Sequence, residues 1–316
     1  MILYQLYATN MNLNTLCEDV LYEVFRLCDL QSIYNLSLTT ENINRITKEE
    51  RLWKDLLCDI SDGNDYFKLL SCNTYYLAMK KYCELLTLKI KFDMLESVID
   101  IYNITRLNLS NKQLVTLPSE LGNLSSLERL YLSNNQLVTL PSDSKPVESE
   151  GPHWELGHLS SLERLDLRYN KLVTLPSELG HLSSLKELHL DNNQLVTLPS
   201  DSKPVESEGP HWELGNLSSL VYLDLENNKL ATLPSELGNL SSLVHLDLDN
   251  NQLVALPSEL GHLSSLEYLY LRNNKLATLP SELGNLSSLV SLYLNHNQWV
   301  TLPSELGNLS NLHIYK

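Results

Sequence analysis

Two histidines in the middle of the sequence belong to the residue types that bind metal ions. His189 and His245 both have carboxylates near them, and imidazole with carboxylate is a ligand set used by zinc and other transition metals. The two histidines lie two repeat units apart, where parallel strands would separate them by about 10 Å. That spacing is too long for one shared ion, so the sequence predicts neither a metal site nor a cofactor.

The other reactive side chains lack the partners that catalysis requires. Serines occur as Ser-Ser pairs without a histidine and a carboxylate held beside them, and no glycine-rich phosphate loop is present. Cys17 and Cys28 have the character of small buried residues rather than of activated thiols. We therefore expect a protein that is not an enzyme.

Composition limits the partners and the compartment. The 316 residues carry 23 Lys plus Arg against 39 Asp plus Glu, a net charge of −16, which disfavours nucleic acid and anionic membranes as partners. All five cysteines lie before residue 84, none in a Cys-x-x-Cys pair, and no secretory signal opens the sequence. We expect reduced thiols and an intracellular protein of the cytoplasm or nucleus.

A repeat of 23 residues runs from Ile104 to the end of the sequence. Its units follow the pattern L-x-x-L-x-L-x-x-N-x-L-x-x-L-P-x-x-L-G-x-L-x-x, whose places are numbered from the first leucine. They begin at Ile104, Leu127, Leu162, Leu185, Leu220, Leu243, Leu266 and Leu289, with a truncated unit at Leu312. An identical string of twelve residues is inserted twice, at 143–154 and 201–212, which indicates an internal duplication.

Each unit is predicted to form one coil of a solenoid. Leucines at places 1, 4 and 6 predict a short strand whose alternate side chains point inward, as for Leu185, Leu188 and Leu190. Asn at place 9 can satisfy backbone groups of successive coils, and Pro at place 15 stops the strand. Ser235, after one such proline, is predicted to cap a short helical turn. Because one coil cannot enclose its leucines, the coils must stack into a parallel concave sheet of an α/β fold.

The pattern resembles the 23-residue leucine-rich repeats of intracellular Leu-Pro-x-Glu-Leu-Gly type, over a predicted solenoid at 104–316. That resemblance implies a platform for binding proteins. Places 3, 5 and 7 point away from the leucines and differ between units, whereas the Ser-Glu-Leu-Gly turns are nearly constant. We expect a basic protein target to bind on this concave face. The predicted target-binding residues are Glu187, Asp191, Tyr222, Asp224, Glu226, His245, Asp247, Asp249, Tyr268, Tyr270, Arg272 and Tyr293.

Three segments precede the repeats: a tail at 1–12, a small all-α domain at 13–60 and a helical junction or cap at 61–103. The second segment carries Leu16-Cys17-Glu18-Asp19-Val20-Leu21, Val24-Phe25, Asp29-Leu30 and Leu52-Trp53 at spacings that resemble an F-box. In that family the helices dock onto a Skp-type adaptor of a cullin-based ubiquitin ligase. The resemblance implies adaptor contacts through Leu16, Leu21, Phe25, Leu30 and Ile33.

Together the two resemblances imply the substrate-recognition subunit of a cullin-type (SCF) ubiquitin ligase. The amino-terminal domain would join the adaptor, and the concave face would bind the target. Near-identical repeats behind an F-box also resemble families encoded by large DNA viruses, which would place the protein in a host cell. The alternative is a leucine-rich-repeat signalling scaffold or inhibitor whose amino-terminal helices only cap the solenoid.

Overall fold

The computed structural model describes residues 98–141, 158–199, 214–298 and 302–316, together with five single residues between 85 and 94. The chain divides into two compact units, 1–102 and 103–316. The F-box-like segment at 13–60, with the predicted adaptor contacts Leu16, Leu21, Phe25, Leu30 and Ile33, lies outside the described residues, as do the insertions at 143–154 and 201–212. Within the described part of the chain, no helix has the length and apolar character needed to cross a membrane.

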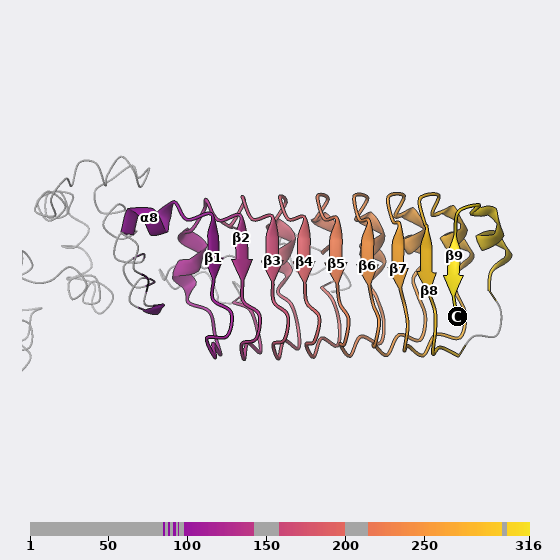
Figure 1. Cartoon of the computed structure of the whole chain (residues 1–316), viewed down its shortest axis with the longest axis horizontal. Coiled ribbons are helices and arrows are strands. Elements are labelled where there is room, and N and C mark those ends of the chain that lie inside the picture. Colours follow the sequence, from indigo (N-terminus) through magenta and orange to yellow (C-terminus); the bar gives the residue numbers. More distant parts are fainter. Residues whose placement is uncertain are drawn as a thin grey trace, which may run out of the picture. The chain divides into compact units, whose positions relative to one another are not determined.

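The second unit is built on one parallel sheet whose nine strands follow one another in chain order (Figure 1). The strands are β1 (Arg106–Asn108), β2 (Arg129–Tyr131), β3 (Arg164–Asp166), β4 (Glu187–His189), β5 (Tyr222–Asp224), β6 (His245–Asp247), β7 (Tyr268–Tyr270), β8 (Ser291–Tyr293) and β9 (His313–Tyr315). Each strand residue pairs with the same place of the next unit, as Leu188 pairs with Leu223 although 35 residues separate them. The insertion therefore leaves the register of the sheet unchanged.

Short helical turns return the chain between strands. They are the 3-10 helices η2 (Ser119–Asn123), η4 (Ser177–His181), η5 (Leu214–Asn216), η6 (Ser235–Asn239), η7 (Ser258–His262), η8 (Ser281–Asn285) and η9 (Ser304–Asn308). One α-helix, α8 (Val98–Tyr102), belongs to the described part of the first unit. The parallel sheet and the returning turns confirm the predicted repeat solenoid.

Stacked leucines form the core of this unit. Leu185, Leu188 and Leu190 are fully buried, and the leucines at the same places of neighbouring units are buried with them. Burial of apolar surface stabilises a protein by about 25 cal/mol per Å². One coil cannot cover its own leucines, so each coil gains this stabilisation only by stacking on its neighbours. The inward direction predicted for places 1, 4 and 6 is confirmed.

A ladder of buried asparagines connects each coil to the one before it. Asn193 donates from Nδ2 to the carbonyl oxygens of Leu167 and Leu190, both at 3.0 Å. Its Oδ1 accepts from the backbone N–H of Leu172 at 3.0 Å. The residue before it, Asn192, has a φ of 56°, in the left-handed region that asparagine tolerates. The predicted role of place 9 in satisfying backbone groups is confirmed.

The turns begin one residue earlier than capping by serine requires. Pro234 has φ −72° and ψ 147°, and it occupies the cap position of η6 without a side-chain hydrogen bond. Ser235 is the first helical residue, and its hydroxyl donates to a carboxylate oxygen of Glu236 at 3.1 Å. The predicted capping by Ser235 is therefore wrong, because a capping oxygen must come from the residue before the helix.

The glycine of each turn allows close approach of the next coil. A Cβ added to Gly261 would lie against the carbonyl oxygen of Glu282 and 2.8 Å from its carbonyl carbon. At Gly307, in the last turn, the same Cβ would meet nothing within 4 Å. No glycine of the described ranges has a positive φ. Close packing between coils, rather than backbone conformation, therefore explains why position 261 is a glycine, Gly261.

These two glycines form a matched pair for a stability test. We expect Gly261→Ala to lower the free energy of unfolding by about 1–3 kcal/mol, because its methyl group would push two coils apart. Gly307→Ala should leave it nearly unchanged. Urea denaturation followed by circular dichroism measures both, and equal losses would contradict the packing explanation.

Candidate functional site

Side chains at places 3, 5 and 7 cover one face of the sheet, which we call the sheet face. In β5, Tyr222 and Asp224 flank the buried Leu223, so they point to the side opposite the leucine core. All twelve residues predicted to bind a target lie on this face, between β4 and β8. The parallel register places equivalent side chains of successive units next to each other, in continuous rows.

An aromatic row runs along the sheet face from β4 to β9. The Tyr222 and His245 rings are stacked with centroids 4.4 Å apart, and His245 lies 4.9 Å from Tyr270. Tyr270 stacks on Tyr293 at 4.5 Å, and Tyr293 stacks on Tyr315 at the same distance. Because the strand spacing itself brings these rings together, the row offers a preformed apolar surface.

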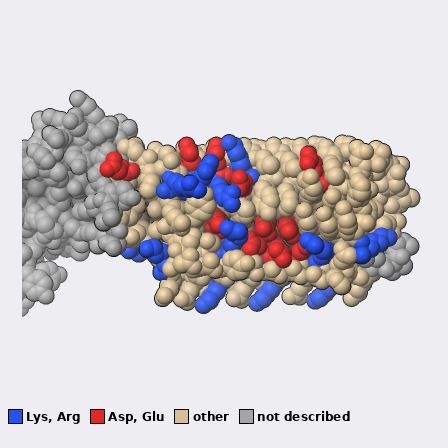
Figure 2. Space-filling view, viewed as in Figure 1, with Lys and Arg blue, Asp and Glu red and all other residues tan. Residues whose placement is uncertain are grey.

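Next to the aromatic row lies an acidic patch formed by Asp224, Glu226 and Asp247. Figure 2 shows carboxylates gathered over the middle strands, with basic side chains on either side. The three carboxyl groups of the patch have no ion-pair partner among the described Lys and Arg side chains.

Crowding of these carboxylates changes their acidity. Burial, together with the charges of Asp249, Asp224 and Glu226, raises the pKa of Asp247 to about 8. Burial and the nearby charges of Asp191 and Glu226 raise the pKa of Asp224 to about 6. Both shifts mean that the folded protein resists full ionisation of the patch.

Arginines compensate the carboxylates at both borders of the patch. On one side Arg272 donates from Nε to Asp249 at 2.6 Å, and its guanidinium lies 5.0 Å from the centroid of Tyr293. On the other side Arg168 donates to both carboxylate oxygens of Asp166, at 3.0 and 2.8 Å. The charges at these borders are already paired within the chain.

Two of the predicted target-binding residues are enclosed rather than exposed. Asp191 is 6% exposed and Asp249 is 4% exposed, because neighbouring side chains of the sheet face cover them. They can orient the groups around them but offer a target little surface. Tyr222, Asp224, Glu226 and Asp247 remain partly accessible.

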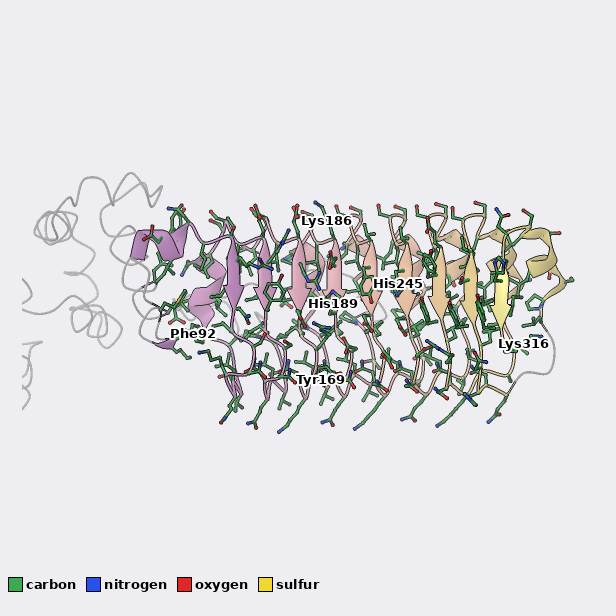
Figure 3. The ribbon with its side chains drawn as sticks, in the orientation of Figure 1. Phe92, Tyr169, Lys186, His189, His245 and Lys316 are labelled. Carbon is green, nitrogen blue, oxygen red and sulfur yellow. The ribbon has the colours of Figure 1, made fainter. Side chains whose placement is uncertain are left out.

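One association on this face was not predicted. The prediction concerned the pair His189 and His245, whereas the structure brings a ligating atom of His189 within 4.8 Å of atoms from Asp191 and Asp224. His189 and Asp224 are paired across β4 and β5, a relation that the register of the repeat would have revealed. Figure 3 labels His189 and His245 near the middle of the row of strands. Burial and the charge of Arg164 lower the pKa of His189, which keeps its ring neutral at neutral pH.

Comparisons with known proteins recognise the repeats. Family models match as "Leucine-rich repeat region" at residues 204–315 and as "Leucine rich repeat" at 148–195 and 126–146. No model of an F-box domain or of a viral repeat family matches. The search of curated proteins found no match.

Two solved bacterial structures share the fold. A leucine-rich-repeat protein of Leptospira interrogans is 34% identical over 69% of this chain, with a TM-score of 0.55. This chain covers 55% of that protein, about half its length. Internalin C2 of Listeria monocytogenes is 27% identical over 73% of this chain and 91% of its own, with a TM-score of 0.54. The chain is thus a leucine-rich-repeat solenoid suited to protein–protein interaction, and such proteins are generally non-catalytic.

Two aspartates of the sheet face should affect stability in opposite directions. Asp247 keeps its proton in the folded state up to a pKa of about 8, whereas the unfolded chain releases it near pH 4. Stability should therefore fall as pH rises through this window, because the unfolded state then binds fewer protons. Asp247→Asn should remove that loss and raise the melting temperature at pH 8 more than at pH 5.

Asp166→Asn should have the opposite effect on stability to Asp247→Asn. Burial raises the pKa of Asp166, but the hydrogen bonds and charge of Arg168 outweigh it and leave the pKa below its usual value. Its stabilisation is present above the unfolded pKa and is lost as pH falls, so this variant should melt at a lower temperature at pH 7. Thermal melting across pH measures both variants. A lower melting temperature for Asp247→Asn at pH 8 would contradict the assignment of charge crowding.

Proposed function

We propose that the sheet face binds a partner protein through a segment rich in lysine or arginine. The observation that carries this proposal is the uncompensated acidic patch of Asp224, Glu226 and Asp247 directly beside the aromatic row. Carboxylates attract the cationic end of such a side chain, while tyrosine rings pack against its apolar stem and interact with its charge. One lysine or arginine side chain would therefore contact both the acidic patch and the aromatic row.

The distribution of variable residues supports the same face. The outer turns η6, η7 and η8 repeat Ser-Glu-Leu-Gly, whereas places 3, 5 and 7 differ from unit to unit. Packing between coils explains the buried leucine and glycine of each turn, but it does not explain why the exposed serine repeats while the places of the sheet face vary.

Two variants with the same number of neutralised carboxyl groups test this proposal. The sheet-face variant combines Asp224→Asn, Glu226→Gln and Asp247→Asn, and the outer-turn variant combines Glu236→Gln, Glu259→Gln and Glu282→Gln. Partners recovered with the wild-type chain from a cell lysate are purified, and their binding is measured by surface plasmon resonance at several salt concentrations. We expect the sheet-face variant to lower the association rate about tenfold and to flatten its salt dependence. Equal effects of the two variants would place binding elsewhere.

A finer proposal concerns the amino-terminal segment. We propose that residues 13–60 dock an intracellular Skp-type adaptor, so that the protein is the substrate-recognition subunit of a cullin-type ubiquitin ligase. The support is the F-box-like spacing that includes Leu16, Leu21, Phe25, Leu30 and Ile33. The protein then needs no catalytic residue, since holding a target beside the ligase raises its effective concentration there. The alternative is a signalling scaffold or inhibitor in which this segment only caps the repeats.

Binding of the adaptor is tested with the full chain. Wild-type protein should retain a purified Skp-type adaptor in a pull-down, and Phe25→Ala with Leu30→Ala should lose it because two apolar contacts disappear. The variant should still bind the partner of the sheet face, which shows that the repeats remain folded. Failure of the wild-type chain to retain the adaptor would favour the scaffold or inhibitor.

A further inference from the structure

A mixed set of metal-ligating side chains lies where β4 and β5 pair. His189 and Asp191 come from the β4 unit, Asp224 from β5, and one ligating atom of each lies within 4.8 Å of the others. We infer that His189, Asp191 and Asp224 form a binding site for a divalent transition-metal ion. Imidazole with two carboxylates suits Mn²⁺, Fe²⁺ or Zn²⁺, whereas Ca²⁺ takes oxygen ligands alone.

Asp191 supplies an independent indication of a ligand. Its side chain is 9% exposed, and its Oδ1 atom is buried without any hydrogen-bond partner. The other oxygen, Oδ2, accepts from the Asn192 side chain at 2.8 Å. A buried carboxylate oxygen that accepts no hydrogen bond is costly, and a cation bound at the cluster would satisfy it.

The nearest basic side chain does not replace such an ion. Arg168 Nε lies 3.9 Å from Asp191 Oδ1, beyond hydrogen-bond distance. The same Nε donates to Asp166 at 3.0 Å, and Arg168 Nη2 donates to its second oxygen. Arg168 is thus held by Asp166, and its charge reaches Asp191 only at longer range.

The imidazole is held in place on two sides. The ring of His189 lies 4.9 Å from the ring of Tyr222, and its Nε2 lies 3.4 Å from a carboxylate oxygen of Glu187. A carboxylate beside a metal-binding histidine typically fixes the orientation of the ring. His189 and Asp224 are paired strand residues and Asp191 lies two residues after the end of β4, so the cluster is positioned by rigid backbone.

A second group of carboxylates shares Asp224 but does not carry the same inference. It joins Asp224 to Glu226 and Asp247, contains no nitrogen ligand, and has no buried oxygen without a partner. Glu226 Oε1 already accepts from the side chains of Asn227 and Asn250, at 3.1 and 2.9 Å. This difference provides the control for the site at His189.

The test titrates the full chain with Mn²⁺ after removal of metals with EDTA and of the EDTA by dialysis. Electron paramagnetic resonance measures free Mn²⁺, which the cysteine thiols elsewhere in the chain bind poorly. We expect one site per chain and a spin-echo modulation from an imidazole nitrogen. His189→Phe keeps a ring beside Tyr222 but removes the nitrogen, so it should abolish the modulation and weaken binding at least about tenfold.

Two further ligand variants and two control variants define the ligand set. Asp191→Asn and Asp224→Asn should each weaken Mn²⁺ binding at least about tenfold, whereas Glu226→Gln and His262→Ala, on the outer turn η7, should leave it unchanged. Thermal melting shows that each variant is folded. Absence of Mn²⁺ binding, or loss in Glu226→Gln with wild-type affinity in His189→Phe, would overturn the inference. Because no partner protein is present, this result is independent of the proposed target binding.

Discussion

The structure depends on the hydrogen bonds that a buried asparagine makes between successive coils. Asn228 donates to the carbonyl oxygens of Leu190 and Leu225 and accepts from the backbone N–H of Leu195, so one side chain joins two coils. A three-residue strand has too few backbone hydrogen bonds and too little apolar area to persist alone. The asparagines and the shared leucine core therefore impose the parallel register on which every feature of the sheet face depends.

That register determines the properties of the sheet face, because it places side chains of the same type next to each other on neighbouring strands. Parallel strands bring tyrosine next to tyrosine at 4.5 Å, which favours stacking, and aspartate next to aspartate, which does not. Asp224 and Asp247 are direct neighbours in the sheet, and burial together with the charges of nearby carboxylates raises the pKa of both. The side chains of the sheet face are thus brought together at some cost to the stability of the coils that carry them. Such a cost is common where a surface serves recognition rather than folding.

Protein recognition and metal binding would use adjoining parts of this face. Asp224 belongs both to the acidic patch and to the cluster with His189 and Asp191. An ion bound there would reduce the negative charge that a basic segment meets, so the two proposals predict a coupling between them. The bacterial leucine-rich-repeat structures share the architecture, so the fold alone does not identify what this chain binds.

The sequence by itself determined the period, the inward leucines, the asparagine ladder and the face that remains open, because each follows from local spacing. It failed at Ser235, where the helix begins at the serine itself. The approach of His189 to Asp224 was also not predicted, although both occupy place 5 of neighbouring units, because register fixes which residues are neighbours but not which side-chain atoms meet. Only the tertiary structure decided that Asp191 and Asp249 are enclosed and that Arg168 and Arg272 pair at the borders. Burial and pairing depend on which side chains adjacent coils bring together, and stacking of the backbone, rather than distance along the chain, sets those neighbours.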